Sequence, residues 1–245
     1  MTRQRAAVPT GLRSEEPKAN ERRGKEAPPG GPEAQSKHSM KNETIGDLTE
    51  TWPVESSEEL ARGRLVGLRR DMVRVPGGDV VGREVLEHPG AVAIVALDPE
   101  QRVLMIRQYR HPVGRLLWEV PAGLRDVAGE PLLVTAEREL LEEAGYRAEQ
   151  WQVLTDTYSS PGISTERVRV FLARGLTMVP ESERSYVRVD EEAHLLFAWL
   201  PLAEAVALLL AGELHNGVTA TGILAAYAAR EDGFAALRDP DAAEG

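Results

Sequence analysis

Residues 138–145 read Arg138-Glu139-Leu140-Leu141-Glu142-Glu143-Ala144-Gly145. Residues three and four apart on a helix are surface neighbours, so Glu139, Glu142 and Glu143 share one patch if this run is helical. Like charges at this spacing destabilise a helix by roughly a few tenths of a kcal/mol per pair, and Arg138 offsets only part of that. Clustered carboxylates are natural ligands of hard divalent cations, and Mg²⁺ usually brings a substrate phosphate with it. The run therefore predicts a metal site on a helix, next to a phosphate-containing ligand.

The sequence before this run predicts a strand, a loop and the start of the helix. Trp118 and Val120 favour a short strand that stops at Pro121. Pro131, at the first helical position, opens the helix, and Gly145 closes it. The apolar residues at helical spacing are Leu133, Ala136, Leu140 and Ala144. We expect them to face the core, with the carboxylates pointing away from it.

The rest of the pattern predicts an α/β fold, with a mixed sheet covered by helices. Strand-like segments are residues 64–75, 80–87, 91–97, 103–109, 151–157, 167–173 and 195–200. Residues 202–210 and 218–229 are expected to be helices. Pro76-Gly77-Gly78-Asp79 is a turn signal, which predicts a hairpin between the first two strands.

Composition favours a soluble enzyme. The net charge of −10 argues against a general nucleic-acid surface, which would need a basic face. No apolar run is long enough to span a membrane. The absence of cysteine excludes disulfides and thiolate catalysis. The first 45 or so residues hold few large apolar side chains, so we expect disorder there, and a chain starting at Met40 should keep its stability and turnover.

The residues from Gly123 to Tyr146 resemble the signature box of the Nudix hydrolases. That box reads glycine, five residues, glutamate, seven residues, then Arg-Glu-apolar-any-Glu-Glu-any-Gly-apolar, and this sequence matches it from Glu130 onward. In one departure, six residues rather than five separate Gly123 from Glu130, which lengthens the loop and leaves the spacing of the helical acids unchanged. Pro161 lies where ADP-ribose pyrophosphatases of this family carry a marker proline, although Ser-Ser-Pro-Gly alone would indicate only a turn.

The resemblance implies the Nudix-type α/β/α sandwich with a mixed sheet, plus a small N-terminal antiparallel β-sheet region. We divide the chain into a disordered tail (1–45), an N-terminal β region (46–88), a Nudix hydrolase domain (89–232) and a loose C-terminal tail (233–245). In the ADP-ribose subfamily the N-terminal sheet mediates homodimerisation, and we expect a homodimer here.

The resemblance also implies the reaction. It is metal-dependent hydrolysis of the pyrophosphate bond of ADP-ribose and related ADP-sugars, giving AMP and ribose 5-phosphate, in the cytoplasm. Mg²⁺ is the expected cofactor, with Mn²⁺ as an alternative, and the expected partner is a small nucleotide-sugar, with no nucleic acid or membrane. Two alternatives stay open. One is a Nudix hydrolase of another nucleotide, such as NADH, a nucleoside triphosphate or coenzyme A, and the other is a non-catalytic ADP-ribose-binding regulator.

By the same resemblance, the carboxylate helix and a later loop supply the catalytic groups. Glu139 and Glu143 are metal ligands, joined by the backbone carbonyl of Ala122, while Glu142 either binds the metal or supports a group that does. The alternative for Glu142 is an ordinary surface pair with Arg138. The general base matches Glu191, with its neighbours at positions 190 and 192 as alternatives and a merely exposed acidic loop as the non-catalytic interpretation.

Substrate-binding residues are assigned by resemblance to several segments of the chain. They are Arg83, Glu84, Arg110, Glu119, Pro161, Gly162, Ser164 and Glu166. Arg110 resembles the family's phosphate-contacting arginine, and a guanidinium fork suits phosphate oxygens. Arg83 matches a position that reaches the substrate of the partner subunit, and Glu166 matches one that contacts the ribose or adenine end.

Overall fold

A computed structural model of the chain describes residues 45–184 and 196–244. The chain divides into two units, residues 1–49 and residues 50–245. The described part of the first unit, residues 45–49, is exposed and irregular. Among the described residues, no helix is long and apolar enough to cross a membrane.

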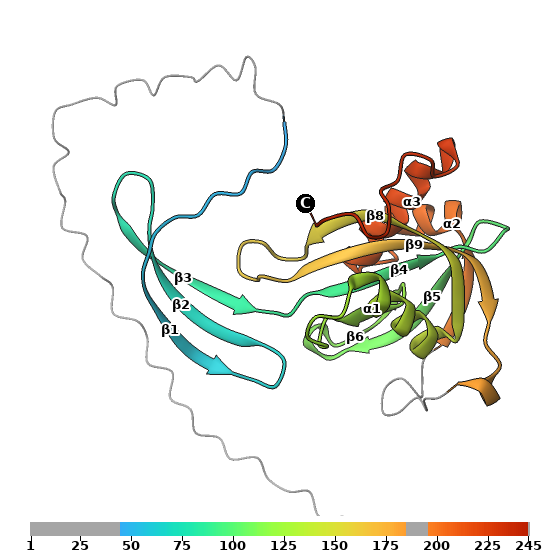
Figure 1. Cartoon of the computed structure of the whole chain (residues 1–245), viewed down its shortest axis with the longest axis horizontal. Helices are drawn as coiled ribbons and strands as arrows, with labels where there is room; N and C mark the ends of the chain where they lie inside the picture. Colours follow the sequence, from blue (N-terminus) through green and yellow to red (C-terminus); the bar gives the residue numbers. More distant parts are fainter. Residues whose placement is uncertain (1–44, 185–195, 245) are drawn as a thin grey trace, which may run out of the picture. The chain divides into compact units, whose positions relative to one another are not determined.

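The second unit begins with an antiparallel sheet of order β1-β2-β3, drawn in blue to green in Figure 1. Its strands are β1 (Val54–Arg62), β2 (Gly67–Arg74) and β3 (Val80–Glu87). Gly77 and Gly78 turn the chain between β2 and β3 with φ angles of 107° and 95°, which glycine adopts without strain. The predicted hairpin is therefore confirmed, and β1 adds a third strand that is exposed along its whole length.

The central sheet has the order β7-β4-β9-β8. Its strands are β4 (Ala91–Ala96), β7 (Ala122–Leu124), β8 (Tyr146–Tyr158) and β9 (Arg167–Met178). Strands β4 and β9 are parallel, and the other neighbours are antiparallel, so the sheet is mixed as the sequence predicts. Strand β4 lies inside the sheet, between β7 and β9, and is buried on both faces. A strand buried on both faces does not alternate apolar and polar residues, which accounts for its continuous apolar run.

A third sheet has the order β10-β5-β6 and is antiparallel. It is formed by β10 (Leu196–Pro201), β5 (Arg102–Arg110) and β6 (Arg115–Glu119). Short 3₁₀ turns lie at His111–Val113, Glu181–Glu183 and Arg230–Asp232.

Within residues 45–184 and 196–244, three α-helices accompany the sheets. They are α1 (Leu132–Glu139), α2 (Leu202–Leu210) and α3 (Gly217–Ala229). Helix α1 starts one residue after Pro131 and continues into a π-helical turn, Leu140–Ala144, which Gly145 ends with a φ of 75°. The glycine closure is thus confirmed, while the wider last turn is a feature that the sequence does not predict.

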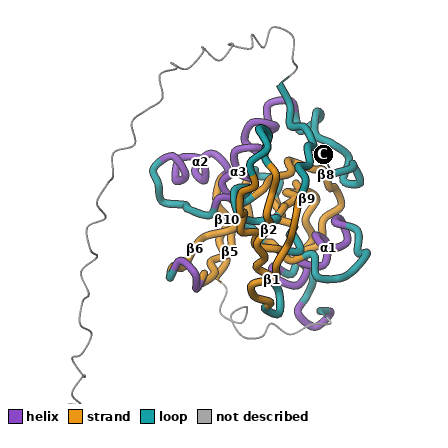
Figure 2. The backbone as a smooth tube through the Cα atoms, turned by 90° about the vertical axis from the view of Figure 1, so that its left-hand side faces the viewer, coloured by secondary structure: helices purple, strands orange, loops and turns teal. Residues whose placement is uncertain are grey.

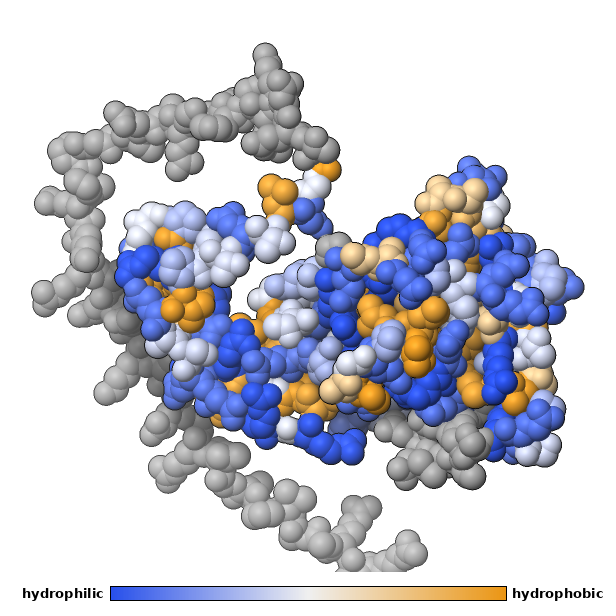
Figure 3. Space-filling model, viewed as in Figure 1, coloured by the Kyte–Doolittle hydropathy of each residue, from blue (hydrophilic) through white to orange (hydrophobic). Residues whose placement is uncertain are grey.

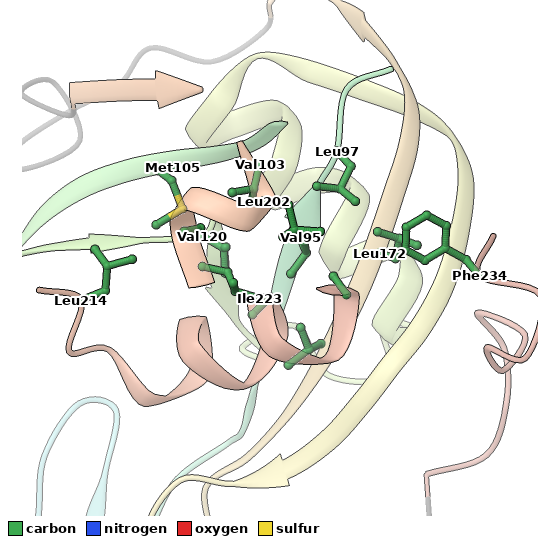
Figure 4. Close-up of a cluster of buried hydrophobic side chains, with 14 of the residues drawn as sticks. Val95, Leu97, Val103, Met105, Val120, Leu172, Leu202, Leu214, Ile223 and Phe234 are labelled. Atoms are coloured by element: carbon green, nitrogen blue, oxygen red, sulfur yellow. The ribbon is translucent and has the colours of Figure 1, made fainter. Parts of the chain in front are cut away.

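The core has two parts, one on each face of β4. Val92, Ile94 and Ala96 pack with apolar residues of α1, whereas Ala93 and Val95 pack with residues of α3. Successive side chains of a strand point to opposite faces, so one strand serves both cores. Figure 2 shows α1 and α3 on opposite sides of the strands, and Figure 4 shows the cluster on the α3 side. These layers confirm the α/β class.

One face of the molecule is mainly polar (Figure 3). On the face drawn in Figure 3, hydrophilic residues predominate and hydrophobic ones lie in smaller groups among them. The segment after α3, expected to be a loose tail, contacts the core in its described part, because Phe234 is only 3% exposed.

Candidate active site

Arg138, near the end of α1, shares its guanidinium among several acids. Its Nη1 donates to Glu139 at 2.7 Å and to Glu142 at 3.2 Å, and its Nη2 donates to Glu130 at 3.1 Å. Glu130 also accepts a hydrogen bond of 2.9 Å from the Thr135 hydroxyl. The extra loop residue before Glu130 therefore leaves this glutamate in contact with the helix, where it helps to hold Arg138.

Gly123 is needed because Glu139 lies directly over it. A Cβ atom placed on Gly123 would lie 1.9 Å from the Cδ atom of Glu139, far inside van der Waals contact. Strand β7 thus passes so close to α1 that only glycine leaves room for the carboxylate. The box glycine, Gly123, and the glutamate that follows the box arginine, Glu139, are therefore in direct contact.

The second buried acid, Glu143, contacts the residue before that glycine. Its Oε2 accepts a hydrogen bond of 2.9 Å from the backbone N–H of Ala122, and the residue is 6% exposed. The predicted partners Glu143 and Ala122 are therefore adjacent. Position 143 lies in the π-helical turn, a geometry that often occurs at functional sites.

The surroundings of this cluster disfavour the ionised form of one of its carboxyl groups, that of Glu139. Burial raises the pKa of Glu139 to about 7, and the neighbouring charge of Glu142 adds to the effect despite the opposing charge of Arg138. The pKa of Glu130, by contrast, lies below its usual value because Arg138 and Thr135 donate hydrogen bonds to it. The cluster therefore contains a largely buried carboxyl group whose ionised form is less favourable than that of an exposed glutamate and would be stabilised by added positive charge.

A divalent cation fits this requirement. The donors are carboxylate and backbone oxygens, which hard cations prefer. In the described parts of the chain, no three Asp, Glu or His side chains are already arranged as a metal site. Arg138 supplies the positive charge between Glu139 and Glu142 in this structure.

A pocket of about 890 Å³ lies beside the cluster. Ala122 and Gly123, which contact the two buried acids, form part of its wall, together with the predicted residues Arg110, Glu119 and Glu166. Its size is within the range of sites for small organic ligands. The pocket therefore joins the carboxylate helix to three of the predicted substrate-binding residues.

Arg110 is held in place by a buried acid. Its Nε donates to the Glu119 Oε1 atom at 2.9 Å and its Nη2 donates to Oε2 at 2.5 Å, while Glu119 is only 2% exposed. A two-point contact of this kind fixes the plane of the guanidinium. Arg110 is on the pocket wall, where a fixed guanidinium can bind an anionic group.

Several other predicted residues lie away from the pocket in this chain. Arg83 and Glu84 are exposed on β3, where Glu84 accepts a hydrogen bond from Arg70. Pro161 and Gly162 are exposed in the loop between β8 and β9. The predicted base Glu191 and its alternatives Asp190 and Glu192 lie outside the described residues.

The loop that carries Pro161 and Ser164 is tied to the N-terminal sheet. Leu86 of β3 donates a backbone hydrogen bond to Ile163 at 2.7 Å and accepts one from Thr165 at 3.0 Å. Leu86 and Ser164 thereby form a parallel bridge. This loop therefore connects β3 to the pocket wall, where Glu166 follows it.

Sequence reasoning missed much of the pocket wall. It is lined in addition by Leu65, His88, Tyr158, His215, Asn216 and Thr219, among others. No local pattern marks His88 or His215 as a binding residue, yet the fold brings both to one cavity. Thr219 accepts a hydrogen bond of 3.1 Å from the N–H of Val120, which ties the start of α3 to the strand before the box. No local pattern signals these contacts, because they join distant segments.

The chain resembles known proteins both in sequence and in fold. A family model described as the NUDIX domain matches residues 87–220, more than half of the chain. A solved structure described as an ADP compounds hydrolase has a TM-score of 0.62 at 20% identity, over 77% of this chain and 99% of that one. At this identity the likeness concerns the fold.

Curated relatives are similar over most of their length. A protein of Mycobacterium tuberculosis named ADP-ribose pyrophosphatase is 52% identical over 76% of this chain and 87% of its own. One with the same name from Bacillus subtilis is 35% identical, over 69% and 88% of the two chains. A methanol dehydrogenase activator of Bacillus methanolicus is 34% identical, over 73% and 94%.

Proposed function

Because the chain belongs to the Nudix family, we propose that it hydrolyses the pyrophosphate bond of ADP-ribose and related ADP-sugars, giving AMP and ribose 5-phosphate. The observation that carries the proposal is the 52% identity to a relative named ADP-ribose pyrophosphatase, over 87% of that relative. The complete set of box acids beside a pocket supports an enzyme rather than a regulator that only binds the nucleotide.

The carboxylate helix would hold the metal. We assign Glu139, Glu143 and the carbonyl of Ala122 as ligands of Mg²⁺, with Mn²⁺ as an alternative, and Glu142 as a ligand or a support for one. When bound, the cation polarises phosphoryl oxygens and lowers the pKa of its water. The raised pKa of Glu139 supports this assignment, because a nearby cation would stabilise its ionised form.

The other residues would bind and orient the substrate. Arg110, fixed by Glu119, would hold a phosphate, and Glu166 on the pocket wall would contact the ribose or adenine end. Pro161, Gly162 and Ser164 would set the path of the loop that leads to Glu166. Alignment of the attacking water remains assigned to the loop that contains Glu191.

A panel of substrates tests the reaction. With Mg²⁺ present, initial rates for ADP-ribose, NADH, GDP-mannose, coenzyme A and dGTP give kcat/KM for each, and we expect ADP-ribose to have the highest value. Chromatography should then identify AMP and ribose 5-phosphate as the only products. A higher kcat/KM for dGTP or coenzyme A would sink the assignment, and tight binding of ADP-ribose without turnover would favour the regulator.

We further propose a homodimer formed through the N-terminal sheet. Strand β1 exposes Val54 and Leu60, by 52% and 37%. A small sheet with apolar side chains on its surface is stabilised by packing against another surface. Arg83 and Glu84, which lie away from the pocket of their own chain, would then reach the substrate of the partner.

Mixed dimers test this sharing of the site. Arg83→Ala alone should raise KM and leave the metal dependence unchanged. Mixing it with Glu139→Gln subunits should produce some sites with both changes and some with neither, so ADP-ribose affinity should recover. A protein that is monomeric by light scattering and fully active would contradict the shared site.

The cytoplasmic location of the protein stays a prediction.

A further inference from the structure

The chain after α3 runs along the edge of β8. Phe234 is buried in the core, and its backbone carbonyl accepts a hydrogen bond of 2.9 Å from the Gln152 side chain. Four residues later, the N–H of Val153 donates to the carbonyl of Arg238 at 3.0 Å, in an antiparallel bridge. The segment is therefore held to β8 at two points before it reaches residue 239.

A buried arginine holds the next part of this segment. Arg169 of β9 is 3% exposed, and its guanidinium donates to the carbonyl oxygens of Ala242 at 2.6 Å and Ala243 at 3.1 Å. The same guanidinium donates to both carboxylate oxygens of Asp156, at 2.7 Å and 3.0 Å. Asp156 also accepts from Arg238 at 3.0 Å. Backbone carbonyls of the segment thus accept hydrogen bonds from a buried guanidinium, which also pairs with Asp156.

The last described residue joins two parts of the pocket wall. Glu244 lies 3.2 Å from Nη1 of Arg125 and 3.7 Å from Nε of Arg167. Arg125 directly follows Leu124, which lines the pocket. The guanidinium of Arg167 stacks on the ring of Tyr158 with its carbon 5.6 Å from the ring centre, and Tyr158 lines the pocket as well.

The positions of these contacts separate them from the metal-binding acids. Asp156 and Arg169 are direct cross-strand partners, one step from the pocket residues Thr157 and Val168. Glu139 and Glu143, by contrast, belong to α1 and its π-helical turn. A change in the C-terminal segment should therefore act first on the wall formed by β8 and β9, and it can reach α1 only through Arg125 and β7.

We propose that residues 238–244 are a positioning element that holds Tyr158, Glu166 and Leu124 in the geometry that binds the substrate. The effect on ADP-ribose rests on the proposed function, whereas the effect on the wall itself does not. The segment touches no reacting atoms. It acts through Arg169, Asp156 and Arg167, so its removal is expected to affect KM more than kcat.

Two variants and one control, each compared with the parent chain, test the inference. The first variant ends at Leu237, and the second is Glu244→Gln, which keeps the side chain and removes its charge. The control is Asp241→Asn, which removes a charge from the same segment without altering the pairs with Arg125 and Arg167. Hydrogen exchange of the amides of residues 156–168 is measured without substrate, and KM and kcat are measured with ADP-ribose and Mg²⁺.

The expected results differ in size between the variants. The truncation should accelerate exchange across residues 156–168 and raise KM about tenfold, with kcat changed by less than about twofold. Glu244→Gln should raise KM about threefold, and the control should match the parent chain, because isolated exposed charges matter little. Unchanged exchange and unchanged KM in both variants would overturn the proposal, as would a lower melting temperature without a change in KM. Faster exchange in a protein that does not hydrolyse ADP-ribose would support the positioning role and refute the proposed reaction.

Discussion

Two clusters of charged side chains lie near the pocket, and they have opposite compositions. In the first, one arginine, Arg138, is shared by Glu130, Glu139 and Glu142. In the second, one aspartate, Asp156, is paired with Arg169 and Arg238, and Arg167 lies 3.9 Å away. The first has an excess of negative charge and the second an excess of positive charge.

The two clusters also differ in how the excess is compensated. Backbone carbonyls accept hydrogen bonds from Arg169, and Glu244 lies 3.7 Å from Nε of Arg167. Hydrogen bonds from Arg169 and Arg238 outweigh the effect of burial, so the pKa of Asp156 lies below its usual value. In the first cluster the pKa of Glu139 rises to about 7 instead. The difference separates a structural cluster, complete within the chain, from one whose charge calls for an external cation.

The largest expected effect is on catalysis, in the first cluster. Glu139→Gln and Glu143→Gln should each lower kcat on the order of 1000-fold, because lost metal ligation removes several kcal/mol of transition-state stabilisation. Neither change should lower the stability of the metal-free protein, since each removes a like charge. Steady-state kinetics and urea unfolding measure the two quantities. Near-normal turnover in Mg²⁺ would show that the altered glutamate is not a ligand.

The matching change in the second cluster should act on stability instead. Asp156→Asn leaves the buried guanidinium of Arg169 without its counter-charge, which should lower the free energy of unfolding by about 3 kcal/mol. Below the melting transition, kcat should stay within about threefold of the parent value. Glu100→Gln, at an exposed ion pair with Arg102, is the control and should change stability by less than about 0.5 kcal/mol. A large loss of kcat in Asp156→Asn would remove the distinction between the clusters.

A third change displaces a carboxylate without removing it. In Gly123→Ala the new methyl group overlaps the Glu139 carboxyl, so that side chain must move. A displacement of about 1 Å in a catalytic group can cost about 100-fold in rate. We therefore expect kcat to fall by about that factor, with a higher Mg²⁺ concentration needed for half-maximal activity. Unaltered metal dependence would indicate that Glu139 tolerates a different position.

The smallest effect is a dependence of stability on pH, with opposite sign in the two clusters. The pKa of Glu139 in the folded protein, about 7, lies above its ordinary value of 4.5. Its proton therefore stabilises the metal-free fold below about pH 4.5, and this contribution is lost as the pH rises to 7. The pKa of Asp156 is lowered, so its contribution is present above its ordinary value of 3.8 and is lost as the pH falls through its folded pKa.

Urea unfolding in the presence of a chelator measures both trends. Between pH 5 and pH 8, the parent chain should lose about 2.5 kcal/mol of unfolding free energy relative to Glu139→Gln. Below pH 4, the difference in unfolding free energy between the parent chain and Asp156→Asn should shrink, because Asp156 becomes protonated. Parallel curves for the parent and Glu139→Gln would show that burial does not raise the pKa of Glu139.

The elements predicted from the sequence are those with a burial pattern. Residues 202–210 form α2 as predicted, and the apolar run of β4 and the acid-bearing α1 are recognisable because their spacing reflects a packed face. Strand β1 went unpredicted because all of its residues are exposed and only backbone pairing with β2 defines it. Strand β7 has only three residues, too few to show a period.

The residues of the candidate site also fall into those that the sequence predicts and those that it does not. The acids of α1 and their glycine were predictable because their spacing is local, whereas Tyr158, His88 and His215 meet only through the fold. The contacts of residues 238–244 were missed for another reason. Arg169 binds the carbonyls of Ala242 and Ala243, and a backbone acceptor leaves no trace in the choice of side chain.

The π-helical turn at Leu140–Ala144 bears on whether the motif can be transplanted. Hydrogen bonds in such a turn span one residue more than in an α-helix, so side chains beyond it are rotated away from regular helical positions. Copying residues 138–145 onto an ideal helix of a designed protein would therefore present Glu142 and Glu143 in other directions than Glu139 requires. A functional graft would have to include the wide turn, its closing Gly145 and the glycine strand that Glu139 covers.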